Sequence, residues 1–219
     1  MYYTITYIGI HKIMQKIKTI KEGRKTQYVY DDLKFDSKGE VYFYWWVQDL
    51  LSEGFIKDII IHPHPFELFD KVSHSYLEVK KTKNNQKLET LMQPHIYTPD
   101  MAIEWNPIRS SYFVESVHCD FKFKKNKLIA MSQYSPFTYI EVKPTFDQNN
   151  MTRLFMLNQK WVFDKYNEYV NLVKIDTKSV ESSWFALTFV PKRFLLTDAG
   201  VRGRAIHYPV KTLGDYLES

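Results

Sequence analysis

The pattern of apolar and polar positions predicts a chain of short strands interrupted by a few helices. Alternating or β-branched runs favour strands, and apolar residues three or four apart favour helices. Strands are predicted at 28–35, 55–61, 96–105, 112–123, 138–142, 169–175 and 184–190. Prolines break the second strand at 62–65, and residues 66–69 are predicted as its continuation. The Lys- and Asn-rich stretch 80–87 predicts an exposed turn that fits the tip of a long hairpin.

Two helices are predicted in the first quarter of the chain. Residues 11–25 carry isoleucines at helical spacing among many lysines and arginines, so this helix either presents a solvated face or faces phosphates. The second helix runs over 37–52, with Ser37 as N-cap, Glu40 reaching back in a capping box, and Gly54 as the stop. Its apolar stripe contains Glu40, Tyr44, Val47 and Leu51. Glu40 therefore sits on the face expected to be buried.

A third, long amphipathic helix is predicted after Pro144, from a cap region at 147–150 to Asn167. Its stripe consists of Met151, Leu154, Phe155, Trp161, Val162 and Tyr166. A short last helix begins after Thr212. The order of elements indicates one α/β domain over 1–219, with a core at about 28–175, a basic N-terminal helix at 11–25 and a basic C-terminal extension at 184–219.

Composition narrows the class of protein. The 219 residues are 44% hydrophobic and 16% aromatic, enough for one sizeable core. The sequence contains neither a run of about twenty apolar residues nor a signal peptide, so we expect no membrane span and no membrane partner. Cys119 is the single cysteine, which excludes an intramolecular disulfide and favours a reducing, cytoplasmic location. The net charge of +5 is compatible with a polyanionic partner.

The candidate chemistry centres on the strand that ends in Glu141-Val142-Lys143. Alternation along a strand places Glu141 and Lys143 on one face and Val142 in the core. If Asp100 lies on a neighbouring strand, two carboxylates and one lysine converge there. Such oxygen ligands, joined by the carbonyl of Val142, suit a hard divalent cation, and Lys143 could orient a water or hold a phosphate.

Thr98-Pro99-Asp100 followed by Glu141-Val142-Lys143 resembles the motif of PD-(D/E)XK nucleases. The stretch 30–40 looks like the start of phage members related to the junction-resolving endonuclease I. This resemblance implies a restriction-endonuclease-like fold, a central mixed sheet flanked by helices, and cleavage of DNA that depends on Mg²⁺ or Mn²⁺. It also implies that Glu40 joins Asp100, Glu141 and Val142 around the metal, and that Gln159 on the following helix points at the site. Junction cleavage would favour a homodimer.

The path from Asp100 to Glu141 is longer than the motif usually has. Either a β-hairpin is inserted at about 106–136, or the true acidic partner is Asp120 or Glu115. His62 and His64 lie two residues apart, as metal ligands on one strand face would, although the prolines around them favour a loop.

The basic group Lys192, Arg193, Arg202 and Arg204 either contacts DNA or occupies ordinary solvated turns. The sequence thus predicts a metal-dependent, phage-type endodeoxyribonuclease that acts on branched or double-stranded DNA. Two alternatives stay open: a catalytically silent nuclease fold that binds DNA or a virion or transposition partner, and an RNA endonuclease that uses the same site.

Overall fold

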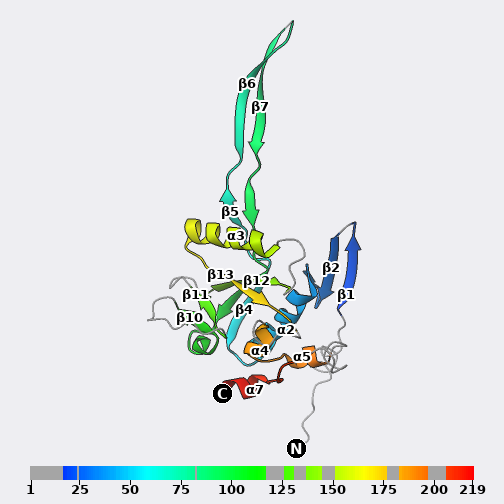
Figure 1. Ribbon diagram of the computed structural model, residues 1–219, viewed down its shortest axis with the longest axis vertical. Helices are drawn as coiled ribbons and strands as arrows, with labels where there is room; N and C mark the ends of the chain where they lie inside the picture. The colour runs from blue at the N-terminus through cyan, green and yellow to red at the C-terminus, as the bar shows by residue number, and fades with distance from the viewer. Residues whose placement is uncertain are drawn as a thin grey trace, which may run out of the picture.

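The computed structural model describes residues 17–23, 25–81, 83–116, 126–130, 137–144, 151–176, 183–196 and 206–219. The fold is mixed α/β, as predicted, and its centre is a four-stranded sheet in the order β13-β12-β9-β4 (Figure 1). These strands are β4 (Ile56–Ile61), β9 (Met101–Trp105), β12 (Phe137–Lys143) and β13 (Val170–Lys174). β12 is parallel to β13 and antiparallel to β9, so the sheet is mixed.

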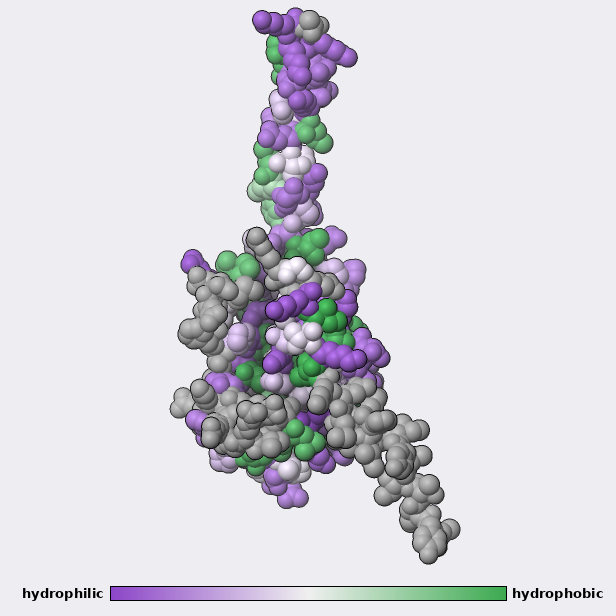
Figure 2. Space-filling model, turned by 90° about the vertical axis from the view of Figure 1, so that its right-hand side faces the viewer, coloured by the Kyte–Doolittle hydropathy of each residue, from purple (hydrophilic) through white to green (hydrophobic). Residues whose placement is uncertain are grey.

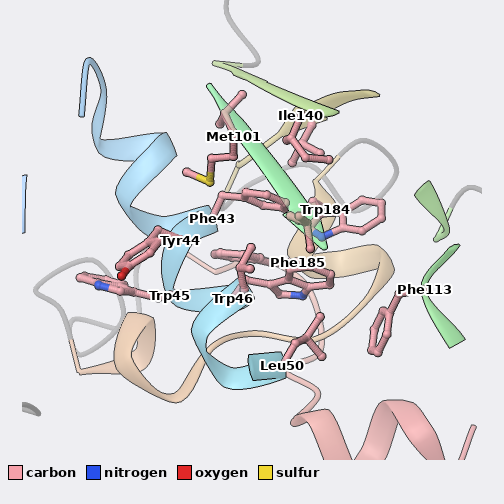
Figure 3. Packing of buried hydrophobic residues seen from close by; sticks show 14 of the residues in the cluster. Phe43, Tyr44, Trp45, Trp46, Leu50, Met101, Phe113, Ile140, Trp184 and Phe185 are labelled. Carbon is pink, nitrogen blue, oxygen red and sulfur yellow. The ribbon is translucent and has the colours of Figure 1, made fainter. Parts of the chain in front are cut away.

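The main core lies between the sheet and helix α2 (Lys38–Ser52). Figure 3 shows the aromatic residues of α2 packed against side chains from β9, β12 and the C-terminal part of the chain. The indole of Trp46, fully buried, stacks on Phe43 and Phe189 at ring distances of 5.3 Å and donates from Nε1 to Thr188 Oγ1 (3.1 Å). Ring stacking on Phe189 and the hydrogen bond to Thr188 together hold α2 against the C-terminal segment.

The predicted N-cap Ser37 and the stop at Gly54 are confirmed for α2, whereas the predicted capping box is wrong. Ser37 Oγ accepts a hydrogen bond from the backbone N–H of Glu40 (3.2 Å), and Gly54, just past the helix end, has a φ of +74°. Glu40 reaches back one residue further than in a capping box, since its Oε2 accepts from the N–H of Asp36 (2.9 Å). Leu51, predicted to lie on the buried stripe, is 40% exposed.

Helix α3 (Met151–Tyr166) and strand β13 also confirm their predictions. Asn167, which ends α3, has a φ of +55°. A second, smaller cluster packs on this helix and contains Phe66, Leu68, Tyr97, Phe155, Val162 and Val170. The predicted stripe of α3 is only partly buried, because Leu154 and Trp161 are each 48% exposed.

The helix predicted over 11–25 is wrong where the structure describes it. β1 (Lys18–Glu22) and β2 (Lys25–Tyr30) form an antiparallel pair, and β3 (Leu33–Phe35) extends it. Asp31 and Asp32 both have positive φ, as a two-residue hairpin turn requires. The isoleucine spacing fits a helix, but pairing with β2 provides the backbone partners instead; residues 11–16 lie outside the described residues.

Strand β4, predicted to be buried, lies at the edge of the central sheet and is exposed on one side. The single strand predicted at 96–105 is two strands, β8 (His95–Tyr97) and β9, because the chain bends at Thr98-Pro99-Asp100. β8 pairs with β5 (Phe66–Phe69) in a separate two-stranded sheet.

The long hairpin predicted around 80–87 is confirmed. β6 (Val72–Val79) and β7 (Asn84–Met92) pair antiparallel and project from the body as a narrow ribbon (Figure 1). We call residues 72–92 the arm. Both strands of the arm lead into β5 and β8 at its root.

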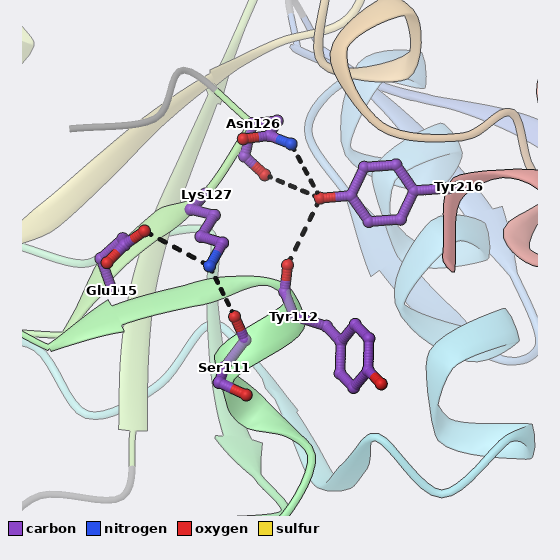
Figure 4. A network of polar contacts seen from close by, with 6 residues as sticks. All are labelled: Ser111, Tyr112, Glu115, Asn126, Lys127 and Tyr216. Carbon is purple, nitrogen blue, oxygen red and sulfur yellow. Dashed lines mark hydrogen bonds and ion pairs between the residues drawn. The ribbon is translucent and has the colours of Figure 1, made fainter. Parts of the chain in front are cut away.

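The hairpin predicted within 106–136 is wrong where it is described. β10 (Val114–Ser116) and β11 (Leu128–Ala130) pair in parallel, whereas a hairpin requires antiparallel pairing, and a 3₁₀ turn, η1 (Ser110–Tyr112), precedes them. Residues 117–125 and 131–136 lie outside the described part of the chain. Figure 4 shows the hydroxyl of Tyr216, on the C-terminal helix α7 (Leu213–Leu217), against Asn126 and the carbonyl of Tyr112.

The strand predicted at 184–190 is wrong. The segment forms a short helix, α4 (Trp184–Leu187), and α5 (Lys192–Leu195) follows. Most of the apolar run is buried in the main core, with Trp184 and Phe189 on Trp46 of α2, so its composition does not distinguish strand from helix. The last helix, α7 (Leu213–Leu217), begins after Thr212 as predicted, and Thr212 also forms a capping box with Asp215. None of the described helices has the length and apolar character needed to cross a membrane.

Candidate functional site

The register of β9 and β12 places Asp100 beside Glu141. Met101 pairs with Ile140, and the next position along each strand is Asp100 on one side and Glu141 on the other. Met101–Ile140 is the last backbone pair of the two strands. Past it, the side chain of Asp100 takes the place of a backbone partner, since its Oδ2 accepts a hydrogen bond from the backbone N–H of Val142 (2.7 Å). The two acidic residues are therefore neighbours despite their separation in the sequence.

Glu141 is 5% exposed and has a partner for each oxygen. Oε1 forms an ion pair with Lys143 Nζ, two residues along the same face of β12. Oε2 accepts from the hydroxyl of Tyr97 (2.8 Å). Val142 points the other way and is 3% exposed within the main core, as the alternation predicted.

Tyr97 is a site residue that the sequence did not reveal. It ends β8 and is 7% exposed. Because 96–105 was interpreted as one strand, the bend that turns Tyr97 toward Glu141 was not expected. The available signal was Pro99, which disfavours a continuous central strand and marks a change of direction two residues after Tyr97.

Glu40 approaches the same region from α2. It is 4% exposed, and Gly39 beside it allows the helix to lie close to β12: a Cβ at Gly39 would be 3.4 Å from Val142 Cγ1. Its carboxylate is close enough for the charge of Lys143 to lower its pKa and for its own charge to raise the pKa of Asp100. The helix start therefore brings a third carboxylate near the end of β12.

The electrostatics of this group are unbalanced. Three carboxylates (Glu40, Asp100 and Glu141) surround one ammonium (Lys143), which gives a formal charge of −2. Burial, together with the charges of Glu141 and Glu40, raises the pKa of Asp100 well above its ordinary value, and Lys143 only partly opposes this. Burial also raises the pKa of Glu40. Burial alone would lower the pKa of Lys143, but the nearby carboxylates raise it. We call these four residues the acid cluster.

The acid cluster fits a hard divalent cation in chemistry. All of its potential metal ligands are oxygens. Its excess negative charge is mostly buried, where water stabilises it poorly. In an extended strand the N–H and C=O of one residue point to the same edge, so the carbonyl of Val142 also faces Asp100. As the side chains stand, no group of three or more His, Cys, Asp or Glu residues in the described ranges is arranged to hold a metal ion. Glu141 would have to share oxygens now bonded to Lys143 and Tyr97.

Gln159, the remaining residue predicted for this site, is oriented by a different contact. Its amide donates to the carbonyl of Val170 (2.6 Å), which lies level with Tyr139 and not with Glu141. Within the described residues no hydrogen bond joins Gln159 to the acid cluster. The neighbouring Asn158 bonds to the ring of His95 (2.8 Å).

The predicted basic group is only partly described, since Arg202 and Arg204 lie outside the described residues. Arg193 has an internal role: its guanidinium bonds to the hydroxyl of Tyr30 and to Gln48 Oε1 (2.9 Å), joining α5 to α2 and β2. The side chain of Lys192 is exposed. The structure thus assigns Arg193 to packing between elements, and a DNA contact by the others stays a prediction.

Of the other candidates, Glu115 belongs to a different sheet, whereas His62 adjoins the acid cluster through its backbone. Glu115 forms an ion pair with Lys127 (3.3 Å; Figure 4), and Asp120 is outside the described residues. His62 and His64 lie in a loop, where the backbone N–H of His62 donates to the carbonyl of Asp100 (3.0 Å). A cavity of about 410 Å³ lies between α7 and the segment before β11 and contains none of the cluster residues.

Comparisons with family models, with curated proteins and with solved structures find no match to this chain. A function must therefore be inferred from the chemistry of the acid cluster and its surroundings.

Proposed function

We propose that this protein is a metal-dependent endonuclease with a restriction-endonuclease-like fold, which hydrolyses phosphodiester bonds in DNA. One observation carries the proposal: Asp100 and Glu141-Val142-Lys143 meet at the end of neighbouring strands of a mixed sheet, with buried excess negative charge. Carboxylates that repel one another in a partly buried site are stabilised either by protons or by a cation. At neutral pH a cation is the alternative that keeps all of them ionised.

Each residue of the acid cluster has a role in this proposal. Asp100, Glu141 and the carbonyl of Val142 would hold one Mg²⁺ or Mn²⁺ ion, and Glu40 would complete its ligands or hold a water. A bound ion of this kind lowers the pKa of a water and offsets charge on the phosphate. Lys143 forms an ion pair with Glu141 that holds it in place, and in the complex it would contact a phosphate oxygen. Tyr97 fixes the orientation of Glu141 from the opposite side.

A cleavage panel with Mg²⁺ or Mn²⁺ tests the proposal. Supercoiled plasmid, linear duplex, single strand, four-way junction and RNA would be incubated with the wild type and with Asp100→Asn, Glu141→Gln and Lys143→Ala. We expect nicking of DNA by the wild type and none by the three variants, with DNA binding retained in all.

Glu115→Gln is the matched control. It removes a carboxylate that is also paired with a lysine but belongs to a different sheet. Its activity should equal that of the wild type. Cleavage that survives all three cluster variants, or that Glu115→Gln abolishes, contradicts the proposal. Preference for RNA over matched DNA would assign the site to an RNA endonuclease.

A catalytically silent DNA-binding protein is the second candidate, and one observation favours it. Lys143 already forms an ion pair with the carboxylate of Glu141. Within the described ranges, the carboxylates are not arranged as a group of three or more metal ligands. Calorimetry with Mn²⁺ separates the two candidates. Cation binding that Asp100→Asn abolishes supports the nuclease, and DNA binding without any cation binding supports the silent protein.

A further inference from the structure

The arm projects from the body with mostly exposed side chains, and its sequence gives it two different faces. Directly paired residues share a face, and residues two apart along a strand share it as well. The pairs from Ser73–Thr90 to Val79–Asn84 therefore define two faces. One face carries Ser73, Ser75, Leu77, Val79, Asn84, Gln86, Leu88 and Thr90. We call it the uncharged face, because it has no ionisable side chain.

Both acidic residues of the arm lie on the opposite face. Glu78 is there with Asn85, Tyr76 and Lys87, and Glu89 lies beside His74. Glu78 is neutralised locally, by Lys87 Nζ (2.7 Å) and by Lys80 Nζ (3.2 Å). The uncharged face therefore presents no carboxylate to a polyanion.

The tip of the arm is strongly basic. Lys80, Lys81 and Lys83 cluster at the turn, and their side chains are exposed. Four lysines against two glutamates give the arm a formal charge of +2. In Figure 2 the outer end of the arm is mostly hydrophilic, whereas hydrophobic residues appear along its inner half.

A two-stranded ribbon alone in water is marginally stable, so the arm needs a covering surface. Leu77, Val79 and Leu88 are 59%, 75% and 72% exposed. A second protein copy is a poor match for this surface. A stable interface uses about 20–30 residues on each side, and the uncharged face has only a third of that number, next to a cationic tip.

We propose that the arm docks in the major groove of duplex DNA, with the uncharged face toward the base edges and the tip lysines on the phosphates. This inference rests on the proposed function, which makes DNA the substrate. The major groove of B-form DNA admits a two-stranded ribbon, and uncharged hydrogen-bonding and methyl-bearing side chains are those that contact base edges there. Lysines on phosphates supply the affinity.

The root of the arm connects it to the acid cluster on both sides. β7 continues into β8, whose last residue, Tyr97, bonds to Glu141. β6 follows β5, which pairs with β8. A duplex gripped by the arm is thereby held at a defined position relative to Asp100 and Glu141.

Fluorescence anisotropy with a short labelled duplex, the full-length wild type and EDTA tests the docking without any cleavage. Lys81→Glu with Lys83→Glu should weaken binding at least about tenfold and reduce the slope of log K against log salt by about 1.8, because two phosphate contacts are lost. The control reverses two exposed lysines elsewhere, Lys57→Glu with Lys211→Glu. It breaks the surface ion pair of Lys57 with Glu104 (3.5 Å), which contributes little to stability, and should change affinity less than about twofold. Both pairs of lysines are exposed.

A second pair of variants tests which face enters the groove. Gln86→Glu and Asn85→Asp each replace an amide by a carboxylate of the same size, at adjacent positions on opposite faces of the arm. Gln86→Glu should weaken binding about tenfold, and Asn85→Asp should change it less than about twofold. Duplex RNA should bind more weakly than DNA, since its major groove is too deep and narrow for a ribbon.

Equal effects of Gln86→Glu and Asn85→Asp, or unchanged binding with the tip variants, overturn the inference. So does light scattering that shows arm variants converting a dimer into a monomer while DNA affinity stays constant, because a second copy would then cover the arm. Failure of the two proposals is distinguishable. Arm-dependent binding without cleavage refutes only the nuclease, and cleavage with arm-independent binding refutes only the docking.

Discussion

Replacing Tyr97 by phenylalanine removes one oxygen atom from the interior of the candidate site. The hydroxyl donates to Glu141 Oε2 over 2.8 Å, and both side chains are nearly inaccessible to water. In Tyr97→Phe the ring still fills the same space, so no cavity forms. Glu141 keeps its ion pair with Lys143 but loses the partner of its second oxygen.

The size of the effect follows from this geometry. A hydrogen bond to a charged acceptor contributes about 1.5–3 kcal/mol, and a buried acceptor left without a donor costs a similar amount. We therefore expect Tyr97→Phe to lower the free energy of unfolding by about 2 kcal/mol. For a chain of this length, such a loss lowers Tm by roughly 4–8 °C.

Urea unfolding followed by tryptophan fluorescence measures this loss. Tyr139→Phe is the matched control: Tyr139 lies on β12, on the same face as Glu141, and its hydroxyl has no hydrogen-bond partner within the described residues. The control should lose less than about 0.5 kcal/mol. If Tyr97→Phe loses no more than Tyr139→Phe, the hydroxyl does not stabilise Glu141 and the reasoning is refuted.

The same variant also reports on activity. Tyr97 acts through Glu141 and is a positioning residue, since its hydroxyl has no role in the proposed chemistry itself. Loss of a group that orients a metal ligand typically lowers metal affinity or activity 10- to 100-fold. We expect Tyr97→Phe to retain measurable cleavage with a raised Mn²⁺ requirement, in contrast to the complete loss expected for Glu141→Gln.

Three further changes test the charge balance and the backbone. Lys143→Met removes the one cation of the acid cluster and should cost about 3 kcal/mol at neutral pH and less at pH 5, as urea unfolding at both values would show. Asp100 has a raised pKa, so the folded state binds its proton more tightly than the unfolded state, and wild-type stability falls as pH rises from about 4 through the raised value. In Asp100→Asn the free energy of unfolding should depend less on pH, so the variant should compare best with the wild type at alkaline pH. A larger destabilisation by Asp100→Asn at pH 8 than at pH 5 would contradict this. Gly54→Ala places a side chain at a φ of +74° and should cost about 1 kcal/mol, whereas Ala in place of the exposed Ser52, within α2, should be tolerated.

Elements whose signals are local were predictable from the sequence. The Ser37 cap, the Gly54 stop and the alternation around Glu141 each depend on residues within a few positions, and all three are seen in the structure. The arm was predictable for the same reason, since an Asn- and Lys-rich turn between two strand-forming runs specifies its own partner.

Elements whose form depends on distant partners were not predictable. Residues 18–22 belong to a stretch with isoleucines at helical spacing but pair with β2. The apolar run at 184–190 is helical over 184–187, where Trp184 packs on Trp46 of α2. β4 has the composition of a buried strand, yet it is the edge strand of the described central sheet. The order of strands in a sheet depends on distant parts of the chain. Tyr97 joined the site only through a bend that a continuous strand would not make.

The long path from Asp100 to Glu141 was the least favourable feature of the sequence motif, and the sheet explains why it is harmless. β9 and β12 are antiparallel, so Asp100 and Glu141 meet at one end of the pair, whereas the chain leaves β9 at Trp105 and enters β12 at Phe137 at the other end. The chain between those two residues therefore starts and ends at the end of the strand pair opposite the acid cluster. Loop closure becomes only slowly more costly with length, by about 0.6 kcal/mol for each doubling. The spacing between the two acids thus reports on the size of an insertion at the far end of the strands, and the register between Met101 and Ile140 decides whether the acids meet.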